Sequence, residues 1–168
     1  MEISNSKILV IGGAGLIGSH IVEELVQEDV GRLVIFDNFT RGKLENIEHV
    51  LQDDRVEYYE GDITHVDVLD YVVKGVDYVF HLAALWLLHC HEFPRASFEV
   101  NIAGTFNVLE ACVKNNVKKL IFLSSVDVYG QVKNKILFED YKPLKPNLYG
   151  KSKFISEKTS GLIICKPV

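Results

Sequence analysis

The sequence predicts an α/β fold in which a doubly wound parallel sheet carries helices on both faces. Short apolar runs alternate along the chain with longer amphipathic stretches, and the runs themselves do not alternate apolar and polar residues. Such strands are buried on both faces, as in parallel sheets whose strands are joined by right-handed helical crossovers. The chain has 168 residues, 48% of them hydrophobic, which is enough for one domain with a substantial core.

The expected elements follow in order along the chain. Apolar runs predict strands over residues 7–11, 33–36, 56–59, 78–80, 120–123 and 162–165. Apolar positions at helical spacing predict helices over residues 16–27, 93–115 and 149–158. Pro94 opens the second helix, and Ser160 with Gly161 is expected to end the third after about three turns. The polar stretch 131–145 predicts a loop.

The composition argues against several kinds of partner. The net charge of −5 does not favour a nucleic acid bound through bulk electrostatics, and no apolar run is long enough to span a membrane. The three cysteines, Cys90, Cys112 and Cys165, form neither a disulfide framework nor a set of metal ligands, which is typical of the reducing cytoplasm. His89 and His91 have no companions at ligand spacing, so we expect polar loop residues and no metal.

A glycine-rich turn joins the first predicted strand to the first helix. Residues 12–18 read Gly-Gly-Ala-Gly-Leu-Ile-Gly. Gly12 permits a tight turn, Gly15 leaves room for a pyrophosphate beside the backbone, and Gly18 lets the helix pack closely on the sheet. In this strand–turn–helix context the three glycines predict a Rossmann-type dinucleotide site.

Two further features complete that predicted site. The N–H groups of Leu16 and Ile17 lie at a helix N-terminus, where they can hold a phosphate. Asp37 ends the second predicted strand, about 20 residues after the glycine turn, and such an acid accepts hydrogen bonds from the adenosine ribose. Its charge repels a 2′-phosphate and favours NAD as the cofactor. Arg41 could receive that phosphate and favour NADP, but a solvated loop charge is the preferred interpretation.

Tyr149 and Lys153 are four residues apart, so on a helix they share one face. A nearby ammonium group lowers the pKa of a tyrosine from about 10, and Tyr149 is then expected to exchange a proton with a substrate hydroxyl. Ser124 and Ser125 end the fifth predicted strand, at the sheet edge where parallel sheets bind ligands. A serine there can hydrogen-bond the same substrate oxygen. A solvated Tyr–Lys pair and a polar strand end are the alternative interpretations.

Several segments together resemble one known family. The matching segments are residues 12–18, 37–39, 61–63, 81–84, 101–105, 124–130 and 149–153. In order and spacing they are similar to the extended short-chain dehydrogenases/reductases of the NAD-dependent epimerase/dehydratase type, and most of all to nucleotide-sugar epimerases. The resemblance extends from Lys7 to about Glu157.

The resemblance implies roles for individual residues. The implied catalytic residues are Ser125, Tyr149 and Lys153. The implied cofactor-binding residues are Gly12, Gly15, Leu16, Ile17, Gly18, Asp37, Asn38, Asp62, Ile63, Leu82, Ala83, Ala84, Asn101, Tyr149 and Lys153. Asp62 and Ile63 would contact adenine, residues 82–84 would line the nicotinamide side, and Asn101 would support the active-site network. Lys153 would hold the nicotinamide ribose and tune Tyr149, the acid/base.

The resemblance further implies an NAD-dependent enzyme that epimerises a nucleotide sugar, a UDP-sugar 4-epimerase-like activity. Related dehydratases place an acid directly after the catalytic hydroxyl, whereas here Val126 stands there and the acid is Asp127. This favours epimerisation or simple redox chemistry. The apolar segment 85–88 suggests an alternative, an oxidoreductase acting on a sterol or small carbonyl compound, and a non-catalytic NAD-binding module is a third.

The expected domain organisation is a single NAD-binding domain over residues 1–168. The substrate domain with which this family continues is expected to be absent from the chain. The resemblance also implies a possible homodimer through a helix pair, for which residues 93–115 and the helix from Tyr149 are the candidates.

Overall fold

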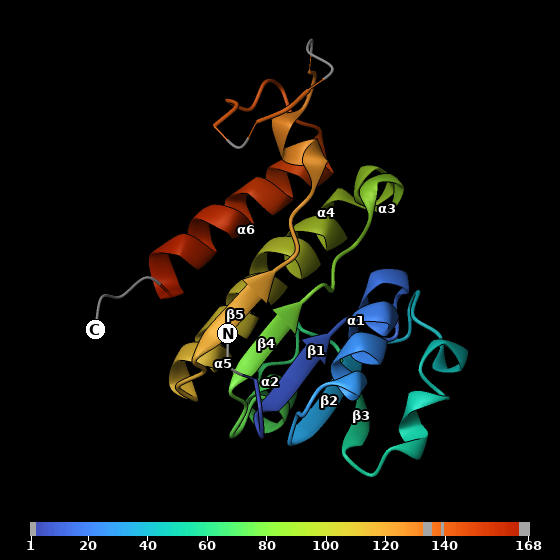
Figure 1. Cartoon of the computed structure of the whole chain (residues 1–168). Helices are drawn as coiled ribbons and strands as arrows, with labels where there is room; N and C mark the ends of the chain where they lie inside the picture. Colours follow the sequence, from blue (N-terminus) through green and yellow to red (C-terminus); the bar gives the residue numbers. More distant parts are fainter. Residues whose placement is uncertain (1–2, 133–135, 139, 165–168) are drawn as a thin grey trace.

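In the computed structural model, which describes residues 3–132, 136–138 and 140–164, the strands form one parallel sheet (Figure 1). The strands are β1 (Lys7–Ile11), β2 (Arg32–Asp37), β3 (Val56–Glu60), β4 (Tyr78–His81) and β5 (Lys119–Phe122). Their order across the sheet is β3-β2-β1-β4-β5, and every neighbouring pair is parallel. The chain therefore crosses from one side of β1 to the other between β3 and β4. The predicted doubly wound α/β fold is confirmed.

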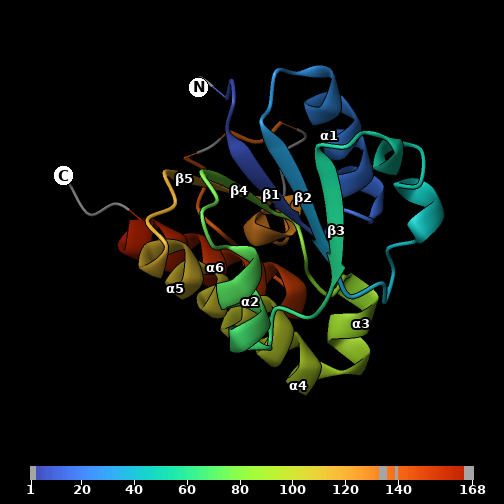
Figure 2. The same cartoon turned by 90° about the horizontal axis from the view of Figure 1, so that it is seen from below.

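Helices cover both faces of this sheet (Figure 2). The α-helices are α1 (Leu16–Gln27), α2 (Val66–Val72), α3 (Leu87–Glu92), α4 (Pro94–Ser97), α5 (Thr105–Lys114) and α6 (Leu148–Ile164). The remaining helical segments are the 3-10 turns η1 (Leu44–Asn46), η2 (Val50–Gln52) and η4 (Val126–Tyr129), and the π-helix η3 (Phe98–Gly104). Helix α1 lies on one face, and α2, α5 and α6 lie on the other. None of the described helices is long and apolar enough to cross a membrane.

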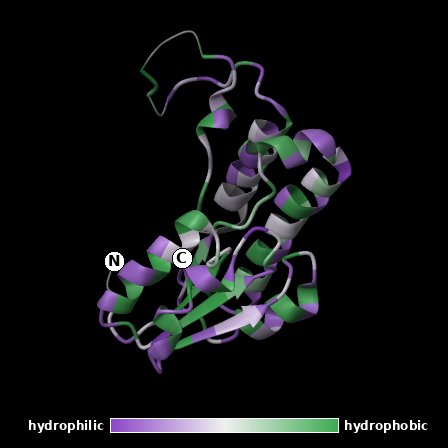
Figure 3. Cartoon of the chain, turned by 90° about the vertical axis from the view of Figure 1, so that its right-hand side faces the viewer, coloured by the Kyte–Doolittle hydropathy of each residue, from purple (hydrophilic) through white to green (hydrophobic). Residues whose placement is uncertain are grey.

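The core has two parts, one on each face of the sheet. In β1, Leu9 and Ile11 pack with the cluster that includes α2 and α5, whereas Ile8 and Val10 pack with the cluster beneath α1. All four side chains are fully buried. Because successive side chains of a strand point to opposite faces, a strand buried on both sides needs an unbroken apolar run. In Figure 3 the hydrophobic colour is concentrated in strands of the sheet.

The C-terminal helix differs from its prediction. Residues 162–164 continue α6, so the predicted sixth strand over 162–165 is wrong, and Cys165 lies outside the described residues. The predicted helix end at Ser160 and Gly161 is wrong too. Ser160 donates its hydroxyl to the carbonyl of Ser156, one helical turn back, at 2.7 Å. A glycine costs a helix only about 1 kcal/mol relative to alanine, which is too little to end it here.

The helical region before β5 is also more divided than predicted. The expected helix over 93–115 consists of α4, the π-helix η3 and α5, which follow one another without a break. His89 and His91, expected in a loop, lie in the short helix α3. The ring of His89 packs edge-on against Phe93 at 5.2 Å between centroids. Within the described ranges, no three His, Cys, Asp or Glu side chains are grouped as metal ligands would be.

Candidate active site

A cleft of about 530 Å³ opens at the carboxyl ends of the strands. Its lining includes most of the predicted site residues, namely Gly12, Gly15, Leu16, Ile17, Gly18, Asp37, Asn38, Asp62, Ile63, Leu82, Ala83, Ala84, Tyr149 and Lys153. These residues come from the ends of β1 to β4, from the start of α1 and from α6, and only the tertiary fold brings them together. Ser125 and Asn101, also predicted, lie outside the lining.

The glycine turn has the geometry that a dinucleotide needs. Gly12 has a φ of +82°, and a Cβ there would lie 2.7 Å from the backbone nitrogen of Ala83. A Cβ on Gly18 would lie 2.1 Å from the carbonyl oxygen of Gly12, so α1 packs directly on the turn. Gly15 lines the cleft, and its Cβ position has a single neighbour, 3.3 Å away. The predicted roles of Gly12 and Gly18 agree with this geometry, and the space beside Gly15 fits a pyrophosphate.

Asp37 is held in place by the backbone on both sides. It accepts the N–H of Ala14 at 3.0 Å and the N–H of Phe39 at 2.9 Å, and only 8% of it is exposed. Burial raises the pKa of Asp37, and these N–H donors oppose the rise because they stabilise the carboxylate. Each carboxylate oxygen retains a lone pair for a further donor, so the side chain can accept ribose hydroxyls from the cleft.

Asn38 and Asp62 form a polar pair at the edge of the cleft. The amide of Asn38 donates to Asp62 at 2.7 Å, and the N–H of Thr64 donates to the other carboxylate oxygen at 2.9 Å. The pair connects the loop after β2 to the loop after β3. Ile63, next to it, is buried and packs against Gly104, where a Cβ would come within 2.7 Å of its side chain.

Tyr149 and Ser125 come together although they belong to different elements. Tyr149 lies in the first turn of α6, and Ser125 caps η4 by accepting the N–H of Asp127 at 3.2 Å. Burial raises the pKa of Tyr149, while a hydrogen bond with the Ser125 hydroxyl opposes that rise. The predicted lowering of the Tyr149 pKa by Lys153 is therefore wrong for the chain without a ligand. The cost of burying the charged phenolate exceeds the stabilisation available.

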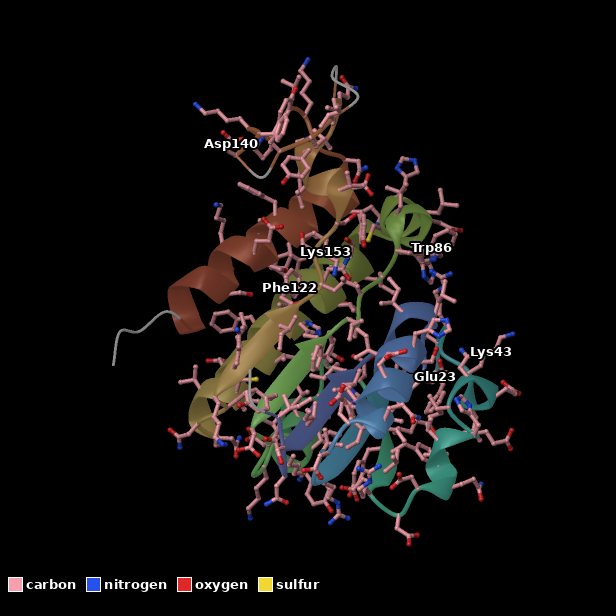
Figure 4. The ribbon with its side chains drawn as sticks, viewed as in Figure 1. Glu23, Lys43, Trp86, Phe122, Asp140 and Lys153 are labelled. Carbon is pink, nitrogen blue, oxygen red and sulfur yellow. The ribbon has the colours of Figure 1, made fainter. Side chains whose placement is uncertain are left out.

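Lys153 is held against the end of β5. Its Nζ donates to the carbonyl oxygen of Leu123 at 2.8 Å and lies 4.7 Å from the centre of the Phe122 ring (Figure 4). Only 3% of the residue is exposed, and burial lowers the pKa of Lys153 to about 8. The cation is thus placed against the end of β5, at the floor of the cleft.

Asn101 links the loop after β4 to α6 through hydrogen bonds. Its amide oxygen accepts the N–H of Leu85 at 2.7 Å, and its amide nitrogen donates to the Leu85 carbonyl at 3.0 Å and to the Ser152 hydroxyl at 3.1 Å. Ser156 donates to the backbone carbonyl of Asn101 at 2.8 Å. The residue therefore fixes the loop after β4 against α6, a position consistent with support of the active-site network. It makes no contact with the cleft itself.

Sequence reasoning missed part of the lining. The additional residues are Ile11, Phe36, Thr40, Arg41, Gly42, Lys43, Asn46, Gly61, Leu85, Trp86, Val100 and Leu123. Arg41 is exposed in its loop, as expected for a solvated charge, and it makes one contact that the sequence did not predict. Its guanidinium lies 4.6 Å from the centre of the Trp86 ring, across the cleft lining. Residues 40–43 follow Asp37 closely, Gly61 lies in a segment that carries the family resemblance, and Leu85 and Trp86 lie in the apolar segment 85–88, so these had a signal in the sequence. Nothing local in the sequence points to the others.

Gly150 is a further structural requirement that the sequence did not reveal. A Cβ at this position would lie 2.1 Å from the carbonyl oxygen of Asp127 and 2.7 Å from its carbon. We expect Gly150→Ala to destabilise the chain by about 1–3 kcal/mol, because the start of α6 must move away from η4. Urea unfolding would measure this. An unchanged midpoint would show that the two segments are not in contact in solution.

Comparisons with known proteins agree with this geometry. The model of the 3-beta hydroxysteroid dehydrogenase/isomerase family matches residues 9–161. The bifunctional UDP-glucose 4-epimerase and UDP-xylose 4-epimerase 1 of Pisum sativum is 36% identical over 167 residues, which cover 94% of this chain and 47% of that protein. The chain thus spans about half the length of the curated relatives it matches.

Solved structures are similar over the same region. The UDP-glucose 4-epimerase of Thermus thermophilus in complex with NAD is 32% identical with a TM-score of 0.83, covering 92% of this chain and 50% of that one. The UDP-N-acetylglucosamine 4-epimerase of Methanobrevibacter ruminantium, in complex with UDP-N-acetylmuramic acid, is 35% identical with a TM-score of 0.84, covering 92% and 49%. The resemblance predicted from the sequence is confirmed.

Proposed function

The chain belongs to the 3-beta hydroxysteroid dehydrogenase/isomerase family, and from this premise we propose that it forms the NAD-binding part of a UDP-sugar 4-epimerase. One observation carries the proposal. A single cleft is lined at one end by the glycine turn and Asp37, and at the other by Tyr149 and Lys153. A dinucleotide bound along it would bring its nicotinamide end to the residues capable of proton transfer. The relatives named for UDP-sugar epimerisation support the substrate class.

The residues present fit NAD. The N–H groups at the start of α1 would hold the pyrophosphate, Asp37 the adenosine ribose, and Asp62 with Ile63 the adenine. Lys153 would hold the nicotinamide ribose. When bound, NAD supplies a group that takes up a hydride and later returns it.

The chain's own residues would handle the proton. The phenol of Tyr149 would accept the proton of a sugar hydroxyl and give it back in the reverse step, which leaves the balance of protons unchanged. The hydroxyl of Ser125, which already hydrogen-bonds this phenol, would orient the same sugar oxygen. Because burial raises the pKa of Tyr149, its action as a base would require stabilisation of the phenolate. The Ser125 hydroxyl supplies a hydrogen bond for this, and the ammonium group of Lys153 lines the same cleft.

A second function is favoured by one feature, the apolar segment after β4. Trp86, Leu87 and Leu88 are all substantially exposed beside the cleft. A sterol or another apolar carbonyl compound would find hydrophobic contact there, and the protein would then be an oxidoreductase. Net consumption of NADH with an apolar ketone, and no epimerisation of UDP-glucose, would support this function over the first.

The assembly and cellular location form part of the same proposal. Helices α5 and α6 carry exposed apolar side chains, among them Phe106, Val113 and Ile155, and a homodimer could bury them. Cys90 and Cys112 are free and buried, which supports a reducing compartment such as the cytoplasm.

Calorimetric titration of the chain with NAD, and separately with NADP, tests the cofactor. We expect NAD to bind at least about tenfold more tightly, because a 2′-phosphate would be brought close to the buried carboxylate of Asp37. In Asp37→Asn, which removes the charge, the ratio of the affinity for NAD to the affinity for NADP should be smaller. A wild-type preference for NADP would instead identify Arg41 as the phosphate ligand. If the chain binds neither cofactor, the proposed function is wrong.

A further inference from the structure

Arg41 and Trp86 make a contact that crosses the cleft. The guanidinium carbon of Arg41 lies 4.6 Å from the centre of the Trp86 ring, which is within the range of a cation–π interaction. Arg41 belongs to the loop after β2, and Trp86 belongs to the loop after β4, immediately before α3. Both residues line the same cleft as the glycine turn. In Figure 4, Trp86 lies beyond the N-terminal end of α1, and Lys43 marks the neighbouring loop.

The Trp86 side of this contact is fixed. The backbone N–H and carbonyl of the preceding residue, Leu85, are both bonded to the amide of Asn101, at 2.7 and 3.0 Å. Asn101 is buried, so this double hydrogen bond is partly shielded from water. The indole ring is therefore presented from a firm backbone position, with 39% of the residue still exposed.

The Arg41 side is fixed at two points. On one side, the N–H of Phe39 donates to Asp37, and on the other the N–H of Lys43 donates to the carbonyl of Ala14 in the glycine turn, at 3.1 Å. Gly42 packs so closely that a Cβ there would lie 2.8 Å from Asp37. With its backbone held at both ends, Arg41 projects its side chain across the opening.

We propose that Arg41 and Trp86 act as a clasp, a pair of positioning residues that a bound dinucleotide must part in order to leave the cleft. The inference rests on the proposed function, since it takes the dinucleotide to be the occupant. A cation at this place suits an anionic cofactor, and the start of α1 below it favours negative charge as well. The clasp slows release of the cofactor and contributes little to the chemical step.

The only tryptophan in the chain is Trp86, so its fluorescence reports the contact directly. In the chain without ligand, we expect acrylamide to quench Trp86 more strongly in Arg41→Gln than in the wild type, because the guanidinium no longer covers the ring. In Arg41→Lys, which retains a cation, the strength of quenching should lie between those of Arg41→Gln and the wild type. Arg95→Gln, which removes an exposed arginine paired with Glu99 on the surface, is the matched control. Acrylamide should quench its Trp86 fluorescence to the same extent as in the wild type. Equal quenching in Arg41→Gln and the wild type would overturn the clasp.

Release of NADH, followed by stopped-flow displacement with excess NAD, tests the consequence. We expect Trp86→Leu and Arg41→Gln each to release NADH about two- to fivefold faster, the factor expected when a partly exposed cation–π contact is lost. The double variant should release no faster than either single variant, since both remove the same contact. Additive effects, or unchanged release, would overturn the clasp. If the wild type binds no NADH, the proposed function fails and the clasp's role in retention fails with it, whereas the quenching comparison still reports whether the contact exists.

Discussion

Replacing Gly18 by alanine is expected to abolish binding of the dinucleotide and to lower the free energy of unfolding by about 3 kcal/mol. The added Cβ would lie 2.1 Å from the carbonyl oxygen of Gly12 and 2.7 Å from the Cα of Gly13. Both neighbours are backbone atoms, so no side chain can rotate to relieve the clash. Helix α1 must instead move away from the turn, and its first N–H groups leave the position in which they would hold a phosphate.

Calorimetric titration with NAD and urea unfolding of the same variant would measure both effects. A loss of affinity of about 100-fold or more is expected, since this factor corresponds to about 2.7 kcal/mol. Gly161→Ala is the matched control, because a Cβ there meets none of the described residues within 4 Å. It should bind NAD like the wild type and be more stable by about 0.5–1 kcal/mol. Wild-type affinity in Gly18→Ala would show that this close approach is not required for binding.

The sheet and the glycine turn could be predicted from the sequence because each has a strong local cause. Strands buried on both faces require unbroken apolar runs, and β1 and β2 at the centre of the sheet coincide with such runs to within one residue. The edge strand β3 was predicted too, although it contains Glu57 and is only partly buried. Gly12 and Gly18 occupy positions that no other residue fits, so their spacing is diagnostic. The place of Asp37 in the site could be predicted from its position after the same glycine motif.

The features that could not be predicted depend on contacts between distant segments. The short apolar run at 162–164 fits a strand and a buried helix equally well, and periodicity cannot separate the two. Nothing next to Arg41 in the sequence points to Trp86, because their contact exists only once β2 and β4 flank β1. The pKa of Tyr149 likewise depends on burial and on a hydrogen bond with Ser125, and neither follows from the spacing of Tyr149 and Lys153.

Replacing Tyr149 by phenylalanine is expected to lower the rate of UDP-sugar epimerisation by about 10²–10⁴-fold, the usual contribution of a positioned acid/base. The phenylalanine ring keeps the packing of α6 against η4 but has no proton to exchange. Binding of NAD should weaken at most about fivefold, which corresponds to one lost hydrogen bond. Two measurements would separate these effects: the rate of UDP-glucose epimerisation by the full gene product, and calorimetric titration with NAD.

Tyr129→Phe provides the matched control for this experiment. It also removes one phenolic hydroxyl from the region around η4, but its ring packs edge-on against Tyr141, 6.2 Å between centroids, and it does not line the cleft. The rate should therefore stay close to that of the wild type. If Tyr149→Phe retains full activity while NAD still binds, the proton must be handled by another group, and Ser125 would then be the next to test. If NAD binding and activity are lost together, Tyr149 is needed for cofactor binding, and the acid/base assignment loses its support.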